Sequence, residues 1–127
     1  MTEEYETGLM AVDPLDVHAQ LGQEWAVVNV RGELDILTSP DLAAILDAVR
    51  QNRRQVAVDL AGVRFVDAHG LRVLVEAART MLDRGQFIIT CPTPLFRRLL
   101  AITGLESEMK LLDQRPIVSG YHNPLRF

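Results

Sequence analysis

The chain has 127 residues, 48% hydrophobic and 24% charged, a composition that fits one folded domain and excludes a disordered chain. Its net charge of −4 argues against a nucleic-acid-binding face, which needs a concentrated basic patch. The first ten residues lack an apolar signal-peptide core, no apolar run reaches membrane-spanning length, and Cys91 is the single cysteine, so we expect a cytoplasmic protein without membrane contact.

The first third of the chain predicts a hairpin followed by a helix. Residues 1–14 show no sustained period and are expected to form a flexible N-terminal arm. Residues 15–21 alternate apolar and polar side chains, and a second strand is expected over residues 25–31, so the two strands predict an antiparallel hairpin. Ser39 before Pro40 predicts an N-cap and a first helical position, and Asn52 is a plausible stop.

The rest of the chain alternates strands and helices. Residues 56–60 predict a buried strand, and Asp67 is placed as the N-cap of a helix closed by Gly85, with Met81 or Leu82 at the end of its buried stripe. A strand over residues 86–91, a helix from Thr93-Pro94 to Gly104 and a short strand over residues 109–112 follow. Such alternation predicts an α/β fold with a mixed, mostly parallel central sheet and an antiparallel N-terminal strand.

Three segments in this order resemble the STAS domain family of sulfate transporters and anti-sigma-factor antagonists. They read VVNVRGELD at residues 27–35, VAVDLAGVRFVDAHGL at residues 56–71 and LLAITGL at residues 99–105. The resemblance implies a single STAS domain over residues 15–112, with residues 113–127 as a C-terminal tail. It also implies that the chain is an antagonist, which binds an anti-sigma factor of the ATP-binding, serine-kinase type and thereby releases a sigma factor.

The resemblance further implies a binding surface. In the family's antagonists, the Gly-Glu-Leu-Asp corner and an Asp-Ser-Ser-Gly-Leu turn lie together at one end of the sheet and engage the anti-sigma factor. The corresponding partner-binding residues here are Asp35, Thr38, Asp67, Ala68, His69, Gly70, Leu71, Arg72 and Val73. Arg72 stands where many relatives carry a small residue, so we interpret it as a specificity residue. Val73 is either a contact or an isolated exposed apolar group.

The family's serine positions are occupied by Ala68 and His69, which a serine kinase cannot phosphorylate. We therefore predict that the chain lacks the conventional phosphoserine switch, in which about −1.5 to −2 charges would be added at the contact surface. The nearest hydroxyls belong to Thr38 and Ser39, which we interpret as helix caps rather than phosphate acceptors. Asp35 is open to two interpretations, a partner contact or a turn-forming aspartate.

Other chemistry at the turn is weaker. His69 reads first as a neutral surface residue, with a phosphohistidine or a pH-sensing contact as alternatives. Asp67 beside His69 resembles part of a catalytic dyad, but no nucleophile accompanies it, so we expect no enzyme activity, no cofactor and no metal site. Cys91 is interpreted as a small buried filler, with a reactive thiol as the alternative.

Two other functions stay open from the sequence. The chain could be a STAS subunit of another regulatory or lipid-transport assembly. It could also be a nucleotide or small-molecule sensor, because backbone N–H groups at a helix N-terminus suffice to bind an anion.

Overall fold

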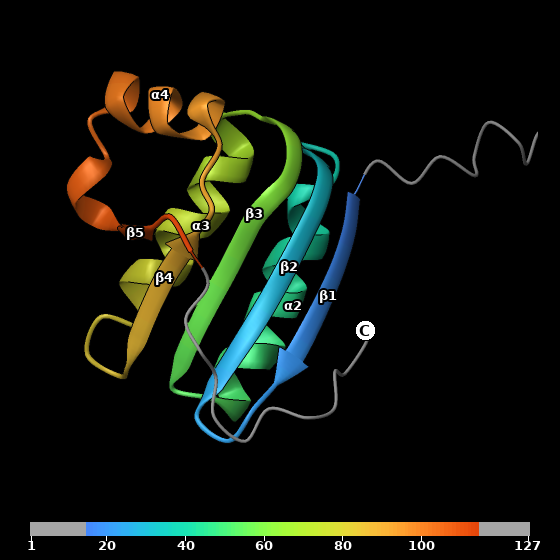
Figure 1. Ribbon diagram of the computed structural model, residues 1–127, viewed down its shortest axis with the longest axis vertical. Coiled ribbons are helices and arrows are strands. Elements are labelled where there is room, and N and C mark those ends of the chain that lie inside the picture. The colour runs from blue at the N-terminus through green and yellow to red at the C-terminus, as the bar shows by residue number, and fades with distance from the viewer. Residues whose placement is uncertain (1–14, 115–127) are drawn as a thin grey trace, which may run out of the picture.

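The computed structural model describes residues 15–114. They form one mixed sheet of five strands, and helices connect the parallel strands along the chain (Figure 1). The strands lie side by side in chain order and are β1 (Leu15–Leu21), β2 (Trp25–Leu34), β3 (Gln55–Val66), β4 (Gln86–Thr90) and β5 (Lys110–Leu112). The helices are α2 (Ser39–Asn52), α3 (Ala68–Thr80), α4 (Pro94–Thr103) and the short 3-10 turn η1 (Glu106–Glu108). The predicted arm over residues 1–14 and most of the predicted tail lie outside the described residues.

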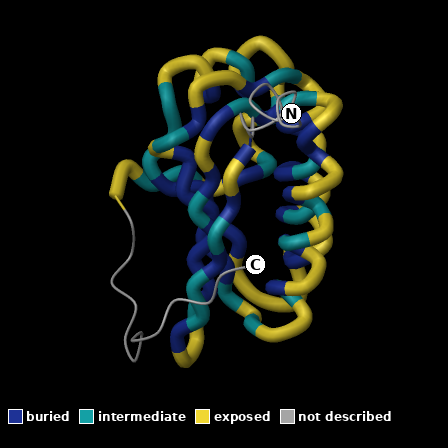
Figure 2. The backbone as a smooth tube through the Cα atoms, turned by 90° about the vertical axis from the view of Figure 1, so that its right-hand side faces the viewer, coloured by how far each residue is buried: buried dark blue, intermediate teal, exposed yellow. Residues whose placement is uncertain are grey.

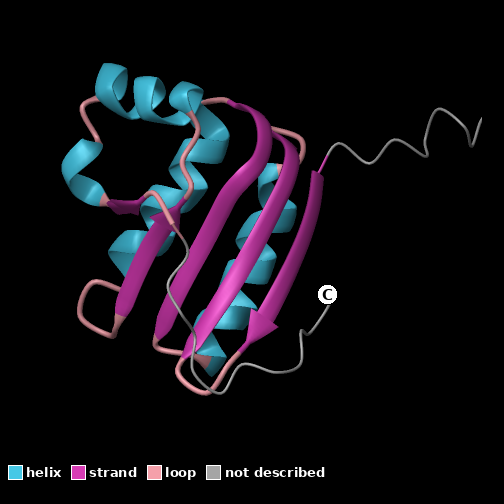
Figure 3. Ribbon diagram, in the orientation of Figure 1, coloured by secondary structure: helices cyan, strands magenta, loops and turns pink. Residues whose placement is uncertain are grey.

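The sheet topology confirms the predicted α/β class. β1 pairs antiparallel with β2, whereas β2, β3, β4 and β5 are parallel to one another (Figure 3). Each parallel step needs a crossover, and a helix supplies it, as the alternation of strands and helices predicts. The order of strands in the sheet therefore follows directly from the order of elements in the chain.

The main core lies between the sheet and the helices α2 and α3, which cover the same face (Figures 1 and 2). Alternate residues of the strands point into it, as the period of two requires. The largest wholly buried side chains include Leu34, Leu42, Leu74, Ile89 and Phe96. A smaller cluster, made of Val27, Ala57 and Ile88, lies apart from this core.

Several boundaries differ from the sequence prediction. α3 ends at Thr80 with Met81 as its C-cap residue, so the prediction that Gly85 closes this helix was wrong. β2 continues to Leu34, and β3 continues to Val66 because the two strands keep pairing beyond a register shift near Gly32. Gly32 adopts a φ of 104°, a conformation that glycine reaches without steric cost and that accompanies the irregular pairing. α2 begins at Ser39 with Thr38 as its N-cap residue, so the prediction of Ser39 as the N-cap was wrong by one position.

Other local predictions are confirmed or corrected by burial. Met81, the C-cap residue that follows α3, continues the buried stripe of that helix with 3% of its surface exposed, whereas Leu82 is 78% exposed. Gly104 ends α4 in the left-handed conformation, as expected of a C-cap glycine. Cys91 is only half-buried and has a φ of 52°, so its interpretation as a buried filler was wrong.

The long pairing of β2 with β3 positions the functional region. Leu34 and Val66, the last residues of the two strands, are in register. Directly beyond them, the backbone N–H of Asp67 donates to the carbonyl of Leu34 at 3.1 Å. The loop after β2 and the turn after β3 therefore leave the sheet at the same edge, and we call residues 35–38 and 67–72 together the corner.

Candidate functional site

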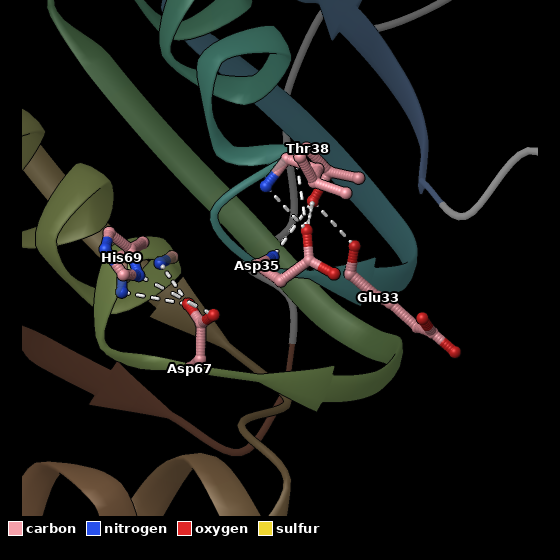
Figure 4. A network of polar contacts seen from close by, with 7 residues as sticks. Glu33, Asp35, Thr38, Asp67 and His69 are labelled. Atoms are coloured by element: carbon pink, nitrogen blue, oxygen red, sulfur yellow. Dashed lines mark hydrogen bonds and ion pairs between the residues drawn. The ribbon is translucent and has the colours of Figure 1, made fainter.

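Asp35 and Thr38 hold the first half of the corner in a compact loop (Figure 4). Asp35 Oδ1 accepts hydrogen bonds from the backbone N–H groups of Leu37 at 3.0 Å and Thr38 at 3.1 Å. The Thr38 hydroxyl accepts from the Asp35 N–H at 2.9 Å and donates to the Glu33 carbonyl at 2.8 Å. These bonds satisfy backbone groups that would otherwise need water, and they fix the path of the chain from β2 into α2.

Thr38 therefore acts differently from its predicted role. It occupies the N-cap position of α2, but its side chain makes no cap hydrogen bond to that helix. The hydroxyl instead closes the loop on the end of β2, and only 5% of the residue is exposed. Ser39 is 7% exposed. Both hydroxyl-bearing residues of this loop are thus poorly accessible to an enzyme that would modify them.

Asp67 caps α3, as the sequence predicts. Its Oδ1 accepts from the backbone N–H groups of His69 at 2.9 Å and Gly70 at 3.1 Å, which are two of the otherwise unpaired donors of the first helical turn. The other carboxylate oxygen, Oδ2, lies 3.7 Å from Nδ1 of His69 (Figure 4). The Asp67 carboxylate therefore caps the helix through one oxygen and lies close to the His69 imidazole with the other.

Gly70 joins the two halves of the corner. A Cβ atom at this position would lie 2.5 Å from Cγ of Leu34 and 2.8 Å from its carbonyl oxygen, too close for any side chain. The absence of a side chain thus lets the first turn of α3 rest directly on the end of β2. The glycine is buried and structural, and the exposed part of the corner lies around it.

The nine predicted binding residues fall into three groups by exposure. Ala68, His69 and Arg72 are exposed, and Asp35, Asp67 and Val73 are half-buried. Thr38, Gly70 and Leu71 are buried, so they support the corner from inside rather than offering a side chain to a partner. All nine nevertheless belong to one region, because α3 starts beside the loop that follows β2.

Sequence reasoning missed the apolar part of this surface. Ile36 is 57% exposed and Leu37 is 83% exposed, and both stand in the loop between β2 and α2. Phe65 is 45% exposed and is paired in register with Glu33, just before that loop. Exposed large apolar side chains gathered at one edge are typical of a binding surface. The signal in the sequence was an Ile-Leu pair in a loop that neither the strand nor the helix pattern explains.

Within residues 15–114, no cluster of three or more histidine, cysteine, aspartate or glutamate side chains is arranged to hold a metal ion. The helices of that same region are all too short or too polar to cross a membrane. At the corner, Oδ1 of Asp35 and Oδ1 of Asp67 each accept hydrogen bonds from two backbone N–H groups. These two carboxylates therefore stabilise the conformation of the loops that form the corner.

Comparison with known proteins agrees with the fold. A family model described as "Mlab, STAS domain" matches residues 17–113. An anti-sigma-B factor antagonist of Staphylococcus aureus is 30% identical over 97 residues, covering 75% of this chain and 90% of that protein. The anti-sigma-F factor antagonist RsfB of Mycobacterium tuberculosis is 28% identical over 89 residues, covering 69% and 73%. The crystal structure of an anti-sigma factor antagonist from Mycobacterium paratuberculosis superposes with a TM-score of 0.72 at 26% identity, covering 79% and 86%.

Proposed function

The chain belongs to the STAS domain family, and we propose that it is an anti-sigma-factor antagonist, which binds an anti-sigma factor of the serine-kinase type and so releases a sigma factor. The observation that carries this proposal is the corner itself. It combines exposed apolar side chains with exposed polar ones on a rigid, hydrogen-bonded base. The relatives that cover most of the chain are named as antagonists of anti-sigma factors.

We assign the contact surface to the exposed part of the corner together with the adjoining residues Phe65 and Val73. Leu37, Ile36 and Phe65 provide apolar area, and burying such area is the main favourable term in association. His69 and Arg72 add polar contacts at the start of α3, where Arg72 selects among partners by its charge and reach. The half-buried residues Asp35, Asp67 and Val73 contribute the exposed parts of their side chains to this surface. Thr38, Gly70 and Leu71 keep this surface in shape.

The absence of a serine switch is part of the proposal. Ala68 and His69 are exposed at the turn, but neither offers a hydroxyl group. Thr38 and Ser39 are almost wholly buried, and the Thr38 hydroxyl is already hydrogen-bonded. A serine kinase would therefore find no accessible acceptor at the corner, and the amount of antagonist, rather than its phosphorylation, would control the anti-sigma factor.

The proposed action is binding in the cytoplasm and not turnover. Asp67 uses one carboxylate oxygen to cap α3 and lies 3.7 Å from His69 through the other. An Asp-His pair needs a nucleophile or a bound water to do chemistry, and the hydroxyl in the neighbouring loop is committed to the Glu33 carbonyl. The corner is therefore better suited to recognition.

A direct experiment uses the full chain with candidate anti-sigma factors and ATP. Complex formation is followed by size-exclusion chromatography, and phosphate transfer is followed with labelled ATP. We expect a stable complex with one candidate, no label on the chain, and no release of the complex by ATP. Lack of a complex with every candidate would count against the function, and label on Thr38 or Ser39 would count against the missing switch.

A gain-of-function variant sharpens this test. His69→Ser restores a hydroxyl at the family's phosphoserine position, whereas Ala68→Ser places one at the neighbouring position and is the matched control. We expect the anti-sigma factor to phosphorylate the His69→Ser variant and then to release it, because the phosphate adds about −1.5 to −2 charges at the interface. The Ala68→Ser variant should stay bound.

A second candidate that the sequence leaves open is a STAS subunit of another regulatory or lipid-transport assembly, since membership of the STAS family does not by itself specify the partner. The same corner would then bind a different protein. Copurification of the tagged full chain from its own cells separates the two: an anti-sigma factor supports the first function, and components of a transporter support the second.

A further inference from the structure

The end of the domain opposite the corner carries a hollow lined with arginines. Its volume is about 260 Å³, and its walls are Arg50, Arg53, Arg54, Met81 and Arg84. These residues come from the end of α2, the link to β3, and the segment between α3 and β4 (Figure 1). The 14 residues of α2, at about 1.5 Å each, place the hollow roughly 21 Å from the corner. It is therefore a separate feature of the molecule.

Two of the guanidinium groups are held in place by backbone carbonyls. Arg53 Nε donates to the Gly22 carbonyl at 2.7 Å, and Arg53 Nη1 donates to the Asn52 carbonyl at 2.8 Å. Arg54 Nε donates to the Arg84 carbonyl at 2.8 Å. A guanidinium has five N–H donors, so each group keeps donors for a ligand while its position is fixed.

Gly85 allows the segment that carries Arg84 to lie close to Arg54. A Cβ at this position would lie only 1.7 Å from the Arg54 carbonyl oxygen, so no side chain fits. The next residue, Gln86, donates its N–H to the same carbonyl at 2.8 Å. The segment that carries Arg84 is thereby pressed against the start of β3, beside Arg54. The convergence of these arginines is built into the backbone.

Only one of the four arginines that line the hollow is paired with a neighbouring acid. Arg50 is paired with Asp47 at 2.8 Å. Within the part of the chain that the structure describes, Arg53, Arg54 and Arg84 have no carboxylate at ion-pair distance. The chain as a whole has a net charge of −4, so this local excess does not reflect a basic composition. Mutual repulsion of the three groups favours a bound anion.

We propose that this hollow binds a small phosphate anion, either inorganic pyrophosphate or the diphosphate group of a nucleotide. Guanidinium groups bind phosphate oxygens through paired hydrogen bonds, which favours a ligand with several anionic oxygens over chloride. Met81 supplies an apolar wall and is 3% exposed. The volume is below the roughly 300–1,000 Å³ of sites for drug-sized ligands, so it fits a phosphate group and leaves any nucleoside outside.

The test uses the full chain and pyrophosphate at constant ionic strength. Isothermal titration calorimetry should show saturable binding, and amide chemical shifts should change at Arg54 and Gly85 but not at His69. Arg84→Gln removes one guanidinium for which no described side-chain hydrogen bond would be lost, and it should weaken binding by about fivefold or more. Arg98→Gln, at an exposed position of α4, changes the net charge equally and should leave binding within about twofold.

A second arm identifies the source of the phosphate. If ADP binds about tenfold more tightly than pyrophosphate, the ligand is a nucleotide, and equal affinity indicates the inorganic anion. Three results would overturn the proposal: no saturable binding up to about 10 mM pyrophosphate, chemical-shift changes confined to the corner, or equal weakening by Arg84→Gln and Arg98→Gln. Unchanged melting temperatures of both variants without ligand would show that their folds are intact.

Discussion

Replacement of Gly70 by alanine tests the junction on which the corner depends. The new Cβ would meet Cγ of Leu34 at 2.5 Å and the Leu34 carbonyl oxygen at 2.8 Å. Leu34 is wholly buried, so neither group has room to withdraw. Overpacking costs about 1–3 kcal/mol, and the contact with a backbone oxygen places this substitution in the upper part of that range, about 2–3 kcal/mol, whereas alanine regains at most about 1 kcal/mol of helix propensity. We therefore expect a net loss of about 1–2 kcal/mol in the free energy of unfolding.

Thermal and urea denaturation measure this loss directly. For a domain of about 100 residues, each kcal/mol lowers the melting temperature by roughly 4–8 °C, so Gly70→Ala should melt about 5–15 °C below the parent chain. Gly62→Ala is the comparison variant. Its Cβ would meet Cγ of Arg31 at 2.7 Å and Cβ at 3.2 Å, and a rotation of the exposed Arg31 side chain about χ1 relieves the closest contact, so its loss should be smaller than that of Gly70→Ala. If Gly70→Ala were as stable as the parent chain, the close packing of α3 on β2 would be wrong.

Four further substitutions follow from the same contacts. Asp67→Ala removes the two cap bonds of α3 and should cost about 0.5–2 kcal/mol in urea denaturation, whereas Asp67→Asn should cost less; equal losses would contradict the capping role. Thr38→Val leaves the Glu33 carbonyl and the Asp35 N–H without the hydroxyl, a loss of about 1–3 kcal/mol that Thr38→Ser should avoid. The hydrogen bond from Arg79 and the charge of that guanidinium lower the pKa of Glu108 below its ordinary value of 4.5, so the stabilising effect of the pair should be complete well above pH 4.5 and fade as the pH falls through the lowered pKa; melting curves of Glu108→Gln should lack this fading. Leu37→Asp should keep the melting temperature, because the side chain is 83% exposed, yet weaken binding to the anti-sigma factor by about tenfold or more; unchanged affinity would remove Leu37 from the interface.

The regular part of the fold could be predicted from the sequence, because it is encoded in local periods. The alternation in residues 15–21 and the helical stripe of α3 each specify one element and its buried face. Glycine at the end of α4 marks a stop by its own conformational freedom. These signals need no knowledge of neighbouring segments, and the strand order follows from the chain order.

The remaining features depend on contacts between distant segments. The second half of β3, residues 61–66, lacks a clear alternation and is a strand because β2 extends beside it. Thr38 is buried because the loop after β2 closes on the end of that strand, where the Thr38 hydroxyl meets the Glu33 carbonyl. Ile36 and Leu37 look like core residues by composition, and only the tertiary structure leaves them exposed. The arginine hollow likewise joins residues that are far apart in the sequence.

The hydrogen bond between Asp67 and Leu34 makes the proposed interface a conformational epitope. Each of the two loops supplies only half of the surface, and the pairing of β2 with β3 together with the contact of Gly70 with Leu34 sets their spacing. A synthetic peptide copying either loop should therefore fail to compete for the anti-sigma factor. An antagonist molecule that is unfolded, truncated or still being synthesised would be ignored by its partner, so transcription would respond only to correctly folded copies.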